Sequence, residues 1–340
     1  MVKIYLLGNN MELIKANIDK DFNKWNDVIL NSPDFYTIAH NPSLLKFLEN
    51  TLKWKGESFF IMDKNEIVAV YQHSCPYDNK SVSMPHFSYG GIIRKDNSYT
   101  VIEIFNQIKM SLPKFFEIRG LKPYTDFYNS DKVATFLDLQ DTIDGQLAMF
   151  KSNHRRKIKK AYKNNLKVTV ESTEEAMIEF YKVYTKNMLR LGSPSLSKRF
   201  FLGLLKEYAY GDIKVFLVFK EKEIIGGAVL LSYNDFVEDC WLSTLSKYNY
   251  LYTSVILYWE MIRFSILEQK KIFSFGRSTK DSSLLNFKRQ WKPIEKQLFF
   301  SYSEEQKLSL KKMTFLTNLW KLLPLRVANF IGPTIADKLY

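Results

Sequence analysis

One pattern occurs in both halves of this chain, and it restricts the fold more than any other feature. Residues 60–70 contain two apolar runs on either side of the polar turn 63–66, and residues 218–228 contain two such runs around the polar turn 220–223. Apolar runs rich in β-branched and aromatic residues, joined by a short polar turn, predict a β-hairpin. Each half of the chain is therefore expected to contain a similar hairpin.

The segments before the two hairpins are also alike. A helical pattern that opens at 32–33, with Leu44 and Phe47 on its apolar side, precedes the first hairpin. One with Phe200 and Leu204 precedes the second. A duplicated α/β domain is the simplest explanation, although any helix–strand–strand segment gives a similar pattern. A length of 340 residues also fits two domains better than one. The predicted division is an N-terminal domain at 1–145, a C-terminal domain at 146–310 and an amphipathic tail at 311–340.

The composition describes a folded and strongly basic protein. Apolar residues make up 46% of the chain and aromatic residues 15%, which supplies enough surface for burial and argues against disorder. The formal net charge is +13. This excess favours a polyanionic partner, such as RNA, a nucleotide-linked substrate or an anionic membrane face, without choosing among them.

The expected compartment is the cytoplasm. The two cysteines, Cys75 and Cys240, form no metal-binding spacing and are too few for a disulfide framework, so a reducing environment is expected. The first residues contain no apolar segment of signal-peptide length, and no apolar run is long enough to span a bilayer. No metal cofactor is predicted.

The stretch 271–293 carries the strongest chemical signal. An apolar strand ends at Gly276, Arg277 and Ser278 follow it, and a short helix then carries Lys288. An arginine and a serine at a strand end, facing a lysine, can hold an anionic or carbonyl oxygen. The alternative is an ordinary strand–helix–strand unit with a solvated basic face, because short motifs are weak signals.

A basic segment at 146–163 joins the two predicted domains. On a single helix, Leu147, Phe150 and His154 fall on one apolar side, together with Ile158 and Ala161. Like charges crowd the opposite side and repel one another instead of pairing, which favours a surface that binds phosphate or RNA. A solvated helix face is the alternative. The predicted phosphate- or RNA-binding residues are Arg155, Arg156, Lys159 and Lys160.

The tail from 315 onward mixes apolar and basic residues. Leu322, Val327 and Phe330 alternate with Lys321 and Arg326. Such a segment can lie on a membrane surface, which would place the protein at the inner face of the membrane through residues 313–340. Docking of the tail onto the rest of the chain is the alternative that we favour.

Several familiar catalytic arrangements are absent from the sequence. There is no P-loop, dinucleotide fingerprint, zinc motif or nucleophile elbow. His86 lies beside a glycine turn and could act as a base, but a structural role is the better interpretation, and His154 is predicted to lie in the core. What remains is direct group transfer, which depends on positioning and on oxyanion stabilisation.

Several segments together resemble the Fem-type (FemABX-like) transferases of the GNAT acyltransferase superfamily, and in particular the subgroup found near exopolysaccharide genes. Four of them lie in or near the second half: Phe-Gly-Arg-Ser at 275–278, Asn-Phe-Lys-Arg-Gln-Trp at 286–291, Leu-Tyr-Trp-Glu at 257–260 and the basic run at 151–161. Pro-His-Phe-Ser-Tyr-Gly-Gly at 85–91 is similar to the first domain of that family, and 320–340 is similar to its tail.

The resemblance implies two tandem GNAT-like domains, each with a mixed, mostly antiparallel sheet flanked by helices. It places Lys288 at the donor site, as the candidate that neutralises a donor phosphate or a developing oxyanion. Phe287 would pack beside Lys288, and Arg277 would contact an anion of the donor or acceptor. The remaining substrate-binding candidates are Ser278, Trp291, Tyr258, Trp259, Tyr89, Gly90 and Gly91.

The chain departs from the family pattern in two places. The helical arm that some Fem proteins use for tRNA is not evident, because 155–163 is too short for it. A CoA-binding GNAT would carry a glycine-rich loop that cradles pyrophosphate, whereas the equivalent stretch here, 246–252, contains no glycine.

Three functions therefore remain open. The first is a Fem-like transferase that moves an acyl or aminoacyl group onto an amine of an envelope or exopolysaccharide precursor, with aminoacyl-tRNA as the donor. The second is an acetyl-CoA-dependent N-acetyltransferase acting on an amino sugar. The third is a degenerate GNAT pair without activity that binds RNA or an anionic membrane surface.

Overall fold

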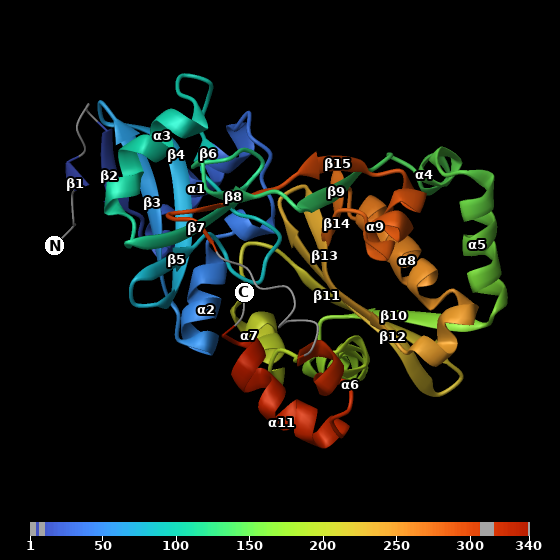
Figure 1. The fold of residues 1–340 in the computed structure, drawn as a ribbon. Coiled ribbons are helices and arrows are strands. Elements are labelled where there is room, and N and C mark those ends of the chain that lie inside the picture. Colours follow the sequence, from blue (N-terminus) through green and yellow to red (C-terminus); the bar gives the residue numbers. More distant parts are fainter. Residues whose placement is uncertain (1–4, 7–10, 307–315, 339–340) are drawn as a thin grey trace. The chain divides into compact units, whose positions relative to one another are not determined.

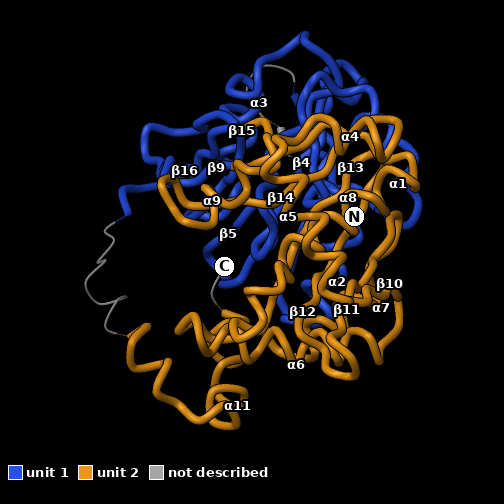
Figure 2. The backbone as a smooth tube through the Cα atoms, turned by 90° about the vertical axis from the view of Figure 1, so that its right-hand side faces the viewer, with its two compact units in different colours: residues 1–133, 296–306 blue, residues 134–295, 307–340 orange. Residues whose placement is uncertain are grey.

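The protein divides into two compact units, shown in different colours in Figure 2. The structure is a computed structural model that describes residues 5–6, 11–306 and 316–338. Unit 1 comprises 1–133 and 296–306, and unit 2 comprises 134–295 and 307–340.

Unit 1 is built on a mixed sheet in the order β1-β2-β3-β4-β5-β7-β16-β8, with β6 paired to β4. Its early strands form an antiparallel meander, and β5 and β7 then pair in parallel through three residue pairs, from Lys80↔Phe115 to Val82↔Glu117. The strands are β1 Tyr5–Leu6, β2 Met11–Lys15, β3 Lys55–Asp63, β4 Glu66–Tyr77, β5 Lys80–Val82, β6 Ile93–Arg94, β7 Phe115–Gly120, β8 Tyr128–Asn129 and β16 Phe299–Tyr302.

Helices cover both faces of the unit 1 sheet. The helix α3 (Val101–Ile108) packs Ile104 and Phe105 against one face, while α1 (Ile18–Asn31) and α2 (Ser43–Leu52) cover the other. Trp25 of α1 is fully buried, and its indole N–H donates to the His40 carbonyl at 3.0 Å. Short 3₁₀ turns occupy Ile38–His40 and Lys109–Ser111.

Unit 2 repeats this strand plan. Its sheet runs in the order β10-β11-β12-β13-β14-β9-β15; β10 to β13 are an antiparallel meander, and β13 and β14 are parallel. In both units a helix therefore connects the meander to a parallel strand, as a crossover requires. The strands are β9 Lys132–Asp138, β10 Leu166–Glu171, β11 Ile213–Lys220, β12 Glu223–Tyr233, β13 Phe236–Thr244, β14 Ile272–Thr279 and β15 Ile294–Gln297.

The helices of unit 2 also form a layer on each side of the sheet (Figure 1). The helix α8 fills one side with α5 beside it, and α6 covers the other side with α7 beside it. Ten of the 15 residues of α8 are buried, which makes it the central helix of this core. The bounds are α4 Ile143–Met149, α5 Ser152–Lys163, α6 Glu174–Leu191, α7 Lys198–Glu207, η3 Ser246–Leu251, α8 Thr253–Leu267, α9 Ser283–Lys288, η4 Arg289–Trp291 and α11 Leu325–Ala336.

The chain passes between the two units more than once. After unit 1, β9 enters the unit 2 sheet beside β14, and after unit 2, β16 returns to the unit 1 sheet and pairs with β7 from Phe299↔Gly120 to Tyr302↔Glu117. As a result, 134–145 lie in unit 2 and 296–306 in unit 1, whereas the sequence-based division assigned them the other way. The unit to which each segment belongs depends on long-range strand pairing, which a local sequence pattern does not indicate.

Two predicted helices differ from the structure. The single helix predicted through 146–163 is interrupted, because Phe150 and Lys151 adopt extended conformations between α4 and α5. The buried side of α5 is nevertheless as predicted, with His154, Ile158 and Ala161 in the core. The helical segment predicted to open at 32–33 instead begins at Ser43, after a 3₁₀ turn that Thr37 caps.

Gly211, in the loop before β11, packs closely against the end of β12. A Cβ atom at Gly211 would lie 2.0 Å from the backbone oxygen of Ser232, a rigid neighbour that cannot move aside cheaply. Gly211→Ala should lower the free energy of unfolding by about 2 kcal/mol or more, measured by chemical denaturation. The control is Gly203→Ala inside α7, where a better helix former should be neutral or stabilising. Equal stability of the two variants would contradict the close approach at Gly211.

Candidate functional site

The parallel strands β13 and β14 pair over only a short length. Their register runs from Phe236↔Ile272 to Glu238↔Ser274, yet β13 continues to Thr244 and β14 to Thr279. On its other edge, β13 contains a bulge, because Asp239 pairs with Leu230 and Trp241 with Val229, which leaves Cys240 as an extra residue. Past the third pair, β13 and β14 therefore continue without a ladder between them.

A glycine in the left-handed conformation changes the direction of β14 just after its last pair with β13. Gly276 has φ = +68°, a conformation that residues with a side chain rarely adopt. The hydroxyl of Ser274 accepts a hydrogen bond from the Gly276 N–H at 3.0 Å, and the Gly276 carbonyl accepts one from Thr135. This geometry sets the Arg277 carbonyl and the Ser278 side chain at the end of the strand.

Lys288 occupies this region. It is the last residue of α9, a short helix that begins at the cap Ser282, whose hydroxyl accepts from the Leu285 N–H at 3.1 Å. The Lys288 side chain is only 3% exposed, and its Nζ donates to the Arg277 carbonyl at 3.2 Å. A buried lysine is rare unless a charged partner compensates the loss of hydration.

The compensating groups come from β13 and α8. Burial lowers the pKa of Lys288, and the negative charges of Asp239 and Glu238 oppose that shift. Burial likewise raises the pKa of Asp239, while a hydrogen bond from Tyr258 and the charge of Lys288 oppose it. Glu238 is itself buried and accepts a hydrogen bond from Ser274 at 2.9 Å. The site is a buried lysine beside two carboxylates, in which burial lowers the pKa of Lys288 and raises the pKa of Asp239.

Two polar atoms near this lysine have no hydrogen-bond partner among the described residues. They are Oδ1 of Asp239, which is 7% exposed, and Oγ of Ser278, which is 3% exposed. Buried polar groups are nearly always satisfied by protein, water or a ligand. These two atoms are therefore the natural contacts for a molecule that enters the site.

The other residues predicted for this site take different places in unit 2. Arg277 is half-buried on β14, and Phe287 packs on Tyr258 with ring centroids 5.8 Å apart. Trp291 and Trp259 lie deep in the core that also contains Phe150. The structure thus brings Lys288, Arg277, Ser278, Phe287 and Tyr258 together, whereas a binding role for the two tryptophans stays a prediction.

The predicted basic surface lies on α5. Arg156, Lys159 and Lys160 are exposed on its outer side. Arg155 differs, since its guanidinium donates to the Phe150 carbonyl at 2.7 Å and to the Ala148 carbonyl at 3.3 Å, which ties the two helices together at their break. Phosphate or RNA binding by these residues stays a prediction.

A basic cavity of ≈ 300 Å³ lies at the end of β13, near the start of η3. Lys186 and Arg190 of α6 line it together with Lys247, whose Nζ pairs with Glu223 at 2.9 Å. The loop 246–252 forms a 3₁₀ helix that ends at Tyr252 with φ = +63°. The N–H groups of Tyr248 and Tyr252 are used within this loop, so any anion here would rely on side-chain cations more than on a cradle of backbone amides.

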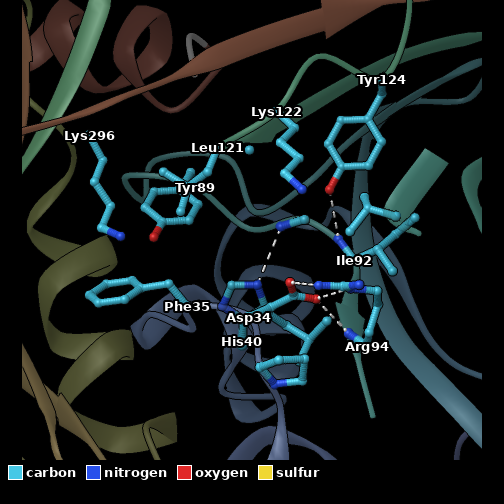
Figure 3. Close-up of a pocket in the computed structure, with 15 residues that line it drawn as sticks. Asp34, Phe35, His40, Tyr89, Ile92, Arg94, Leu121, Lys122, Tyr124 and Lys296 are labelled. Carbon is cyan, nitrogen blue, oxygen red and sulfur yellow. Dashed lines mark hydrogen bonds and ion pairs between the residues drawn. The ribbon is translucent and has the colours of Figure 1, made fainter. Parts of the chain in front are cut away.

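Unit 1 contains a larger cavity, of ≈ 400 Å³, beside β6 and the C-terminal end of β7 (Figure 3). Asp34 and Arg94 form its floor: the Arg94 side chain donates to both Asp34 carboxylate oxygens, at 2.9 and 2.7 Å, and the Arg94 N–H donates at 3.0 Å. Because this pair neutralises itself, Lys122 and Lys296 leave the cavity with a positive balance.

The glycine turn predicted as a binding segment lies at this cavity. Tyr89 and Gly91 line it, and the adjacent Gly90 forms a bridge with Arg119 of β7. A Cβ atom at Gly91 would lie 2.4 Å from the Tyr124 hydroxyl, so the turn and that tyrosine pack closely. Figure 3 shows Lys122 and Lys296 extending into the cavity, and Lys296 places Nζ 4.8 Å from the centre of the Phe35 ring.

Asp239 and Glu238 are the residues that the sequence reasoning missed. Both lie within a strand of otherwise apolar and aromatic residues, and two consecutive carboxylates in such a strand are costly unless a cation is near. That pattern was a usable signal. It could not identify Lys288 as the cation, since the two segments are far apart in the chain.

Comparisons with known proteins agree with this fold. Residues 148–289, which lie within unit 2, match the family model described as an acetyltransferase (GNAT) domain. No curated protein has a significantly similar sequence. This match is confined to unit 2.

Solved structures extend the likeness to both units. The structure of FemX is similar with a TM-score of 0.62 and 13% identity, covering 82% of this chain and 95% of that one. The C-terminal domain of a putative lysylphosphatidylglycerol synthetase from Agrobacterium fabrum gives 0.54 and 10%, covering 85% and 92%. A tandem GNAT protein from the clavulanic acid biosynthesis pathway gives 0.52 and 7%, covering 88% and 100%. The predicted fold of two tandem GNAT-like domains is confirmed.

The region that the structure describes contains no group of three or more histidine, cysteine, aspartate or glutamate side chains arranged to hold a metal ion. Within the same region, no helix is both long and apolar enough to cross a membrane.

The pairing of Lys288 with Asp239 can be measured as a coupling energy. Lys288→Met and Asp239→Asn should each lower the free energy of unfolding at neutral pH, because each leaves a buried group without its partner. The double variant should be less destabilised than the sum of the two single variants, by about 1 kcal/mol or more. Chemical denaturation of all four proteins gives this value, and strict additivity would contradict the pairing.

Proposed function

We propose that this protein is an acyltransferase that forms an amide, moving an aminoacyl or acyl group onto an amine of a cell-envelope or exopolysaccharide precursor, with aminoacyl-tRNA as the preferred donor. One observation carries the proposal: a lysine ammonium is held in a nearly dry site, beside a carboxylate, where two parallel strands stop pairing. The GNAT domain match for 148–289 supports acyl transfer. The fold shared with FemX and with a putative lysylphosphatidylglycerol synthetase supports the aminoacyl form of it.

The chemistry requires a neutral amine and a stabilised oxyanion. The amine nitrogen attacks the acyl carbonyl carbon, a C–N bond forms, and the carbonyl electron pair moves onto oxygen. When this intermediate collapses, the bond to the leaving ester oxygen breaks, and the proton lost by nitrogen is transferred to that oxygen. Lys288 neutralises the oxyanion or a donor phosphate, and a cation acts most strongly where water is excluded.

Asp239 is proposed as the positioning residue for this lysine. Burial alone would favour the neutral amine of Lys288, and the negative charge of Asp239 opposes this. The Tyr258 hydrogen bond in turn helps to keep Asp239 ionised. The three side chains act as a unit that keeps the ammonium protonated inside the core.

The unit 1 cavity is proposed to bind an anionic group of the acceptor. Its two lysines face a floor in which the Asp34–Arg94 pair is already satisfied, so an incoming carboxylate or phosphate would meet a positive balance. Envelope and polysaccharide precursors commonly carry such groups, which is why this cavity fits the proposed substrate class.

An acyl-CoA donor is the second candidate, and the basic cavity at the end of β13 favours it. Lys186, Arg190 and Lys247 could neutralise phosphates there without a glycine-rich loop. The two donors therefore differ in which cations they need.

The central test is removal of the buried ammonium. Lys288→Ala should reduce transfer by about 100-fold or more, because the charge that stabilises the oxyanion is lost. Turnover of an amine acceptor would be measured, and circular dichroism would confirm that the variant remains folded. The matched control is Lys280→Ala, an exposed lysine after β14, which should retain activity. Unchanged turnover by the Lys288 variant would refute the assignment.

Binding measurements on the same proteins identify the donor. Saturable binding of a charged tRNA acceptor-stem mimic, with no binding of acetyl-CoA, supports the aminoacyl donor. Binding of acetyl-CoA that is lost in Arg190→Ala/Lys247→Ala would instead make the protein an N-acetyltransferase. If neither donor binds at physiological salt, the proposed enzyme is wrong, and a binding module without activity takes its place.

An acceptor-binding role for the unit 1 cavity can be tested separately by kinetics. Lys122→Ala/Lys296→Ala should raise the KM for an anionic acceptor by about tenfold while kcat changes little, because both charges act on ground-state binding. Steady-state kinetics with a charged acceptor and with a neutral analogue would show this, since the neutral analogue should be insensitive to the substitution. Equal effects on both acceptors would contradict an anion-binding role.

A further inference from the structure

The C-terminal helix α11 packs onto unit 2 through its smallest residues. Ala328, Gly332 and Ala336 are the buried positions of the helix, and α11 lies beside α6 (Figure 1). A Cβ atom at Gly332 would lie only 3.3 Å from the Ser195 nitrogen, so the helix comes close to the backbone there. The contact is fixed by Asp337, whose carboxylate accepts a hydrogen bond from the Ser197 N–H at 3.0 Å.

Two large apolar residues of α11 lie on the opposite side. At about 100° per residue, Val327 and Phe330 project away from the direction of the buried Ala328 and Gly332. Phe330 is 84% exposed and Val327 is 42% exposed. A helix that serves only to cover its own protein would bury its large apolar side chains and expose its small ones. This helix instead buries three small residues and leaves Val327 and Phe330 exposed.

The residues just before α11 also expose large apolar side chains. Leu316, Leu319 and Leu322 are exposed to 55%, 48% and 79%. Together with Val327 and Phe330 they make five large apolar side chains in contact with solvent within one short segment. A cluster of this kind marks an interaction surface, whereas single exposed apolar residues do not.

The geometry of α11 suits the surface of a bilayer better than its interior. A helix that is apolar on every side is normally buried, and α11 has only 12 residues, about 18 Å at 1.5 Å per residue, against a hydrocarbon core of about 30 Å. A short helix with an exposed apolar face can instead lie in the interface plane, with that face among the lipid headgroups and acyl chains.

The net positive charge of residues 316–338 favours an anionic membrane, and not a second copy of the chain, as the partner of this surface. Between residues 316 and 338 there are three basic residues, Lys321, Arg326 and Lys338, and one acidic residue, Asp337, which gives +3 − 1 = +2. The whole chain carries +13. Two copies meeting at this face would bring like charges together, while anionic lipids would be attracted to it.

We infer that residues 316–338 form an interfacial anchor for an anionic lipid bilayer, in which Leu322, Val327 and Phe330 enter the interface and Lys321 and Arg326 contact the headgroups. The small face of α11 stays on unit 2, so the anchor needs no rearrangement of the folded protein. This inference is independent of the transfer chemistry proposed above.

Vesicle flotation of the full chain tests the anchor. Wild-type protein should float with vesicles of phosphatidylglycerol and phosphatidylcholine, and much less with vesicles of phosphatidylcholine alone. Leu322→Ser/Phe330→Ser should lower the partition coefficient about tenfold for each side chain removed from the interface. The matched control is Met110→Ser, which removes an apolar side chain that is 82% exposed in unit 1 and should change nothing.

The basic residues are tested separately. Lys321→Gln/Arg326→Gln should weaken binding to the anionic vesicles and reduce its dependence on salt, with the apolar side chains intact. Three results would overturn the inference: no flotation of the wild type, flotation that the Leu322/Phe330 variant retains, or concentration-dependent dimers in analytical ultracentrifugation that the same variant abolishes. The last result would make the face an interface between two copies.

Discussion

The buried ammonium of Lys288 depends on an arrangement that no single segment provides. Burial works against its charge, so the lysine is held by the Arg277 carbonyl on one strand and by the carboxylates of the neighbouring strand. That neighbourhood exists because β13 and β14 stop pairing after three residues, and because Gly276 turns β14 with a positive φ. The chemistry of the site follows from an interrupted sheet.

The two units share a strand plan but carry different side chains on the parallel strand. In each, an antiparallel meander is followed by a parallel strand pair of three residues. In unit 1, β7 carries the buried pair Arg119–Glu117, with the guanidinium also lying 4.9 Å from the centre of the Phe300 ring on β16. In unit 2, the corresponding strand ends beside Lys288, Asp239 and unpartnered polar atoms. The corresponding strands of the two units thus carry a buried ion pair in unit 1 and border the buried lysine in unit 2.

Local elements were largely predictable from the sequence. The hairpin of β3 and β4 and that of β11 and β12 lie where the apolar runs and polar turns indicated, since strand periodicity and turn chemistry act over a few residues. The interrupted helix at Phe150 was not predictable from periodicity, because the same apolar spacing continues through the break. The segments exchanged between the units, including β16, were also missed, since pairing partners more than 150 residues apart leave no local signal.

The sequence by itself determined the duplicated plan, the basic charge and the identity of Lys288 as the residue to examine, because each depends on composition, spacing or a short motif. Tertiary structure alone decided that Asp239 and Tyr258 would accompany that lysine and that Trp291 would be buried in the core. It also decided that Phe330 would face solvent while Ala328 is buried. The physical reason is burial. Whether a charged or apolar side chain is stable depends on what surrounds it, and its surroundings come from distant parts of the chain.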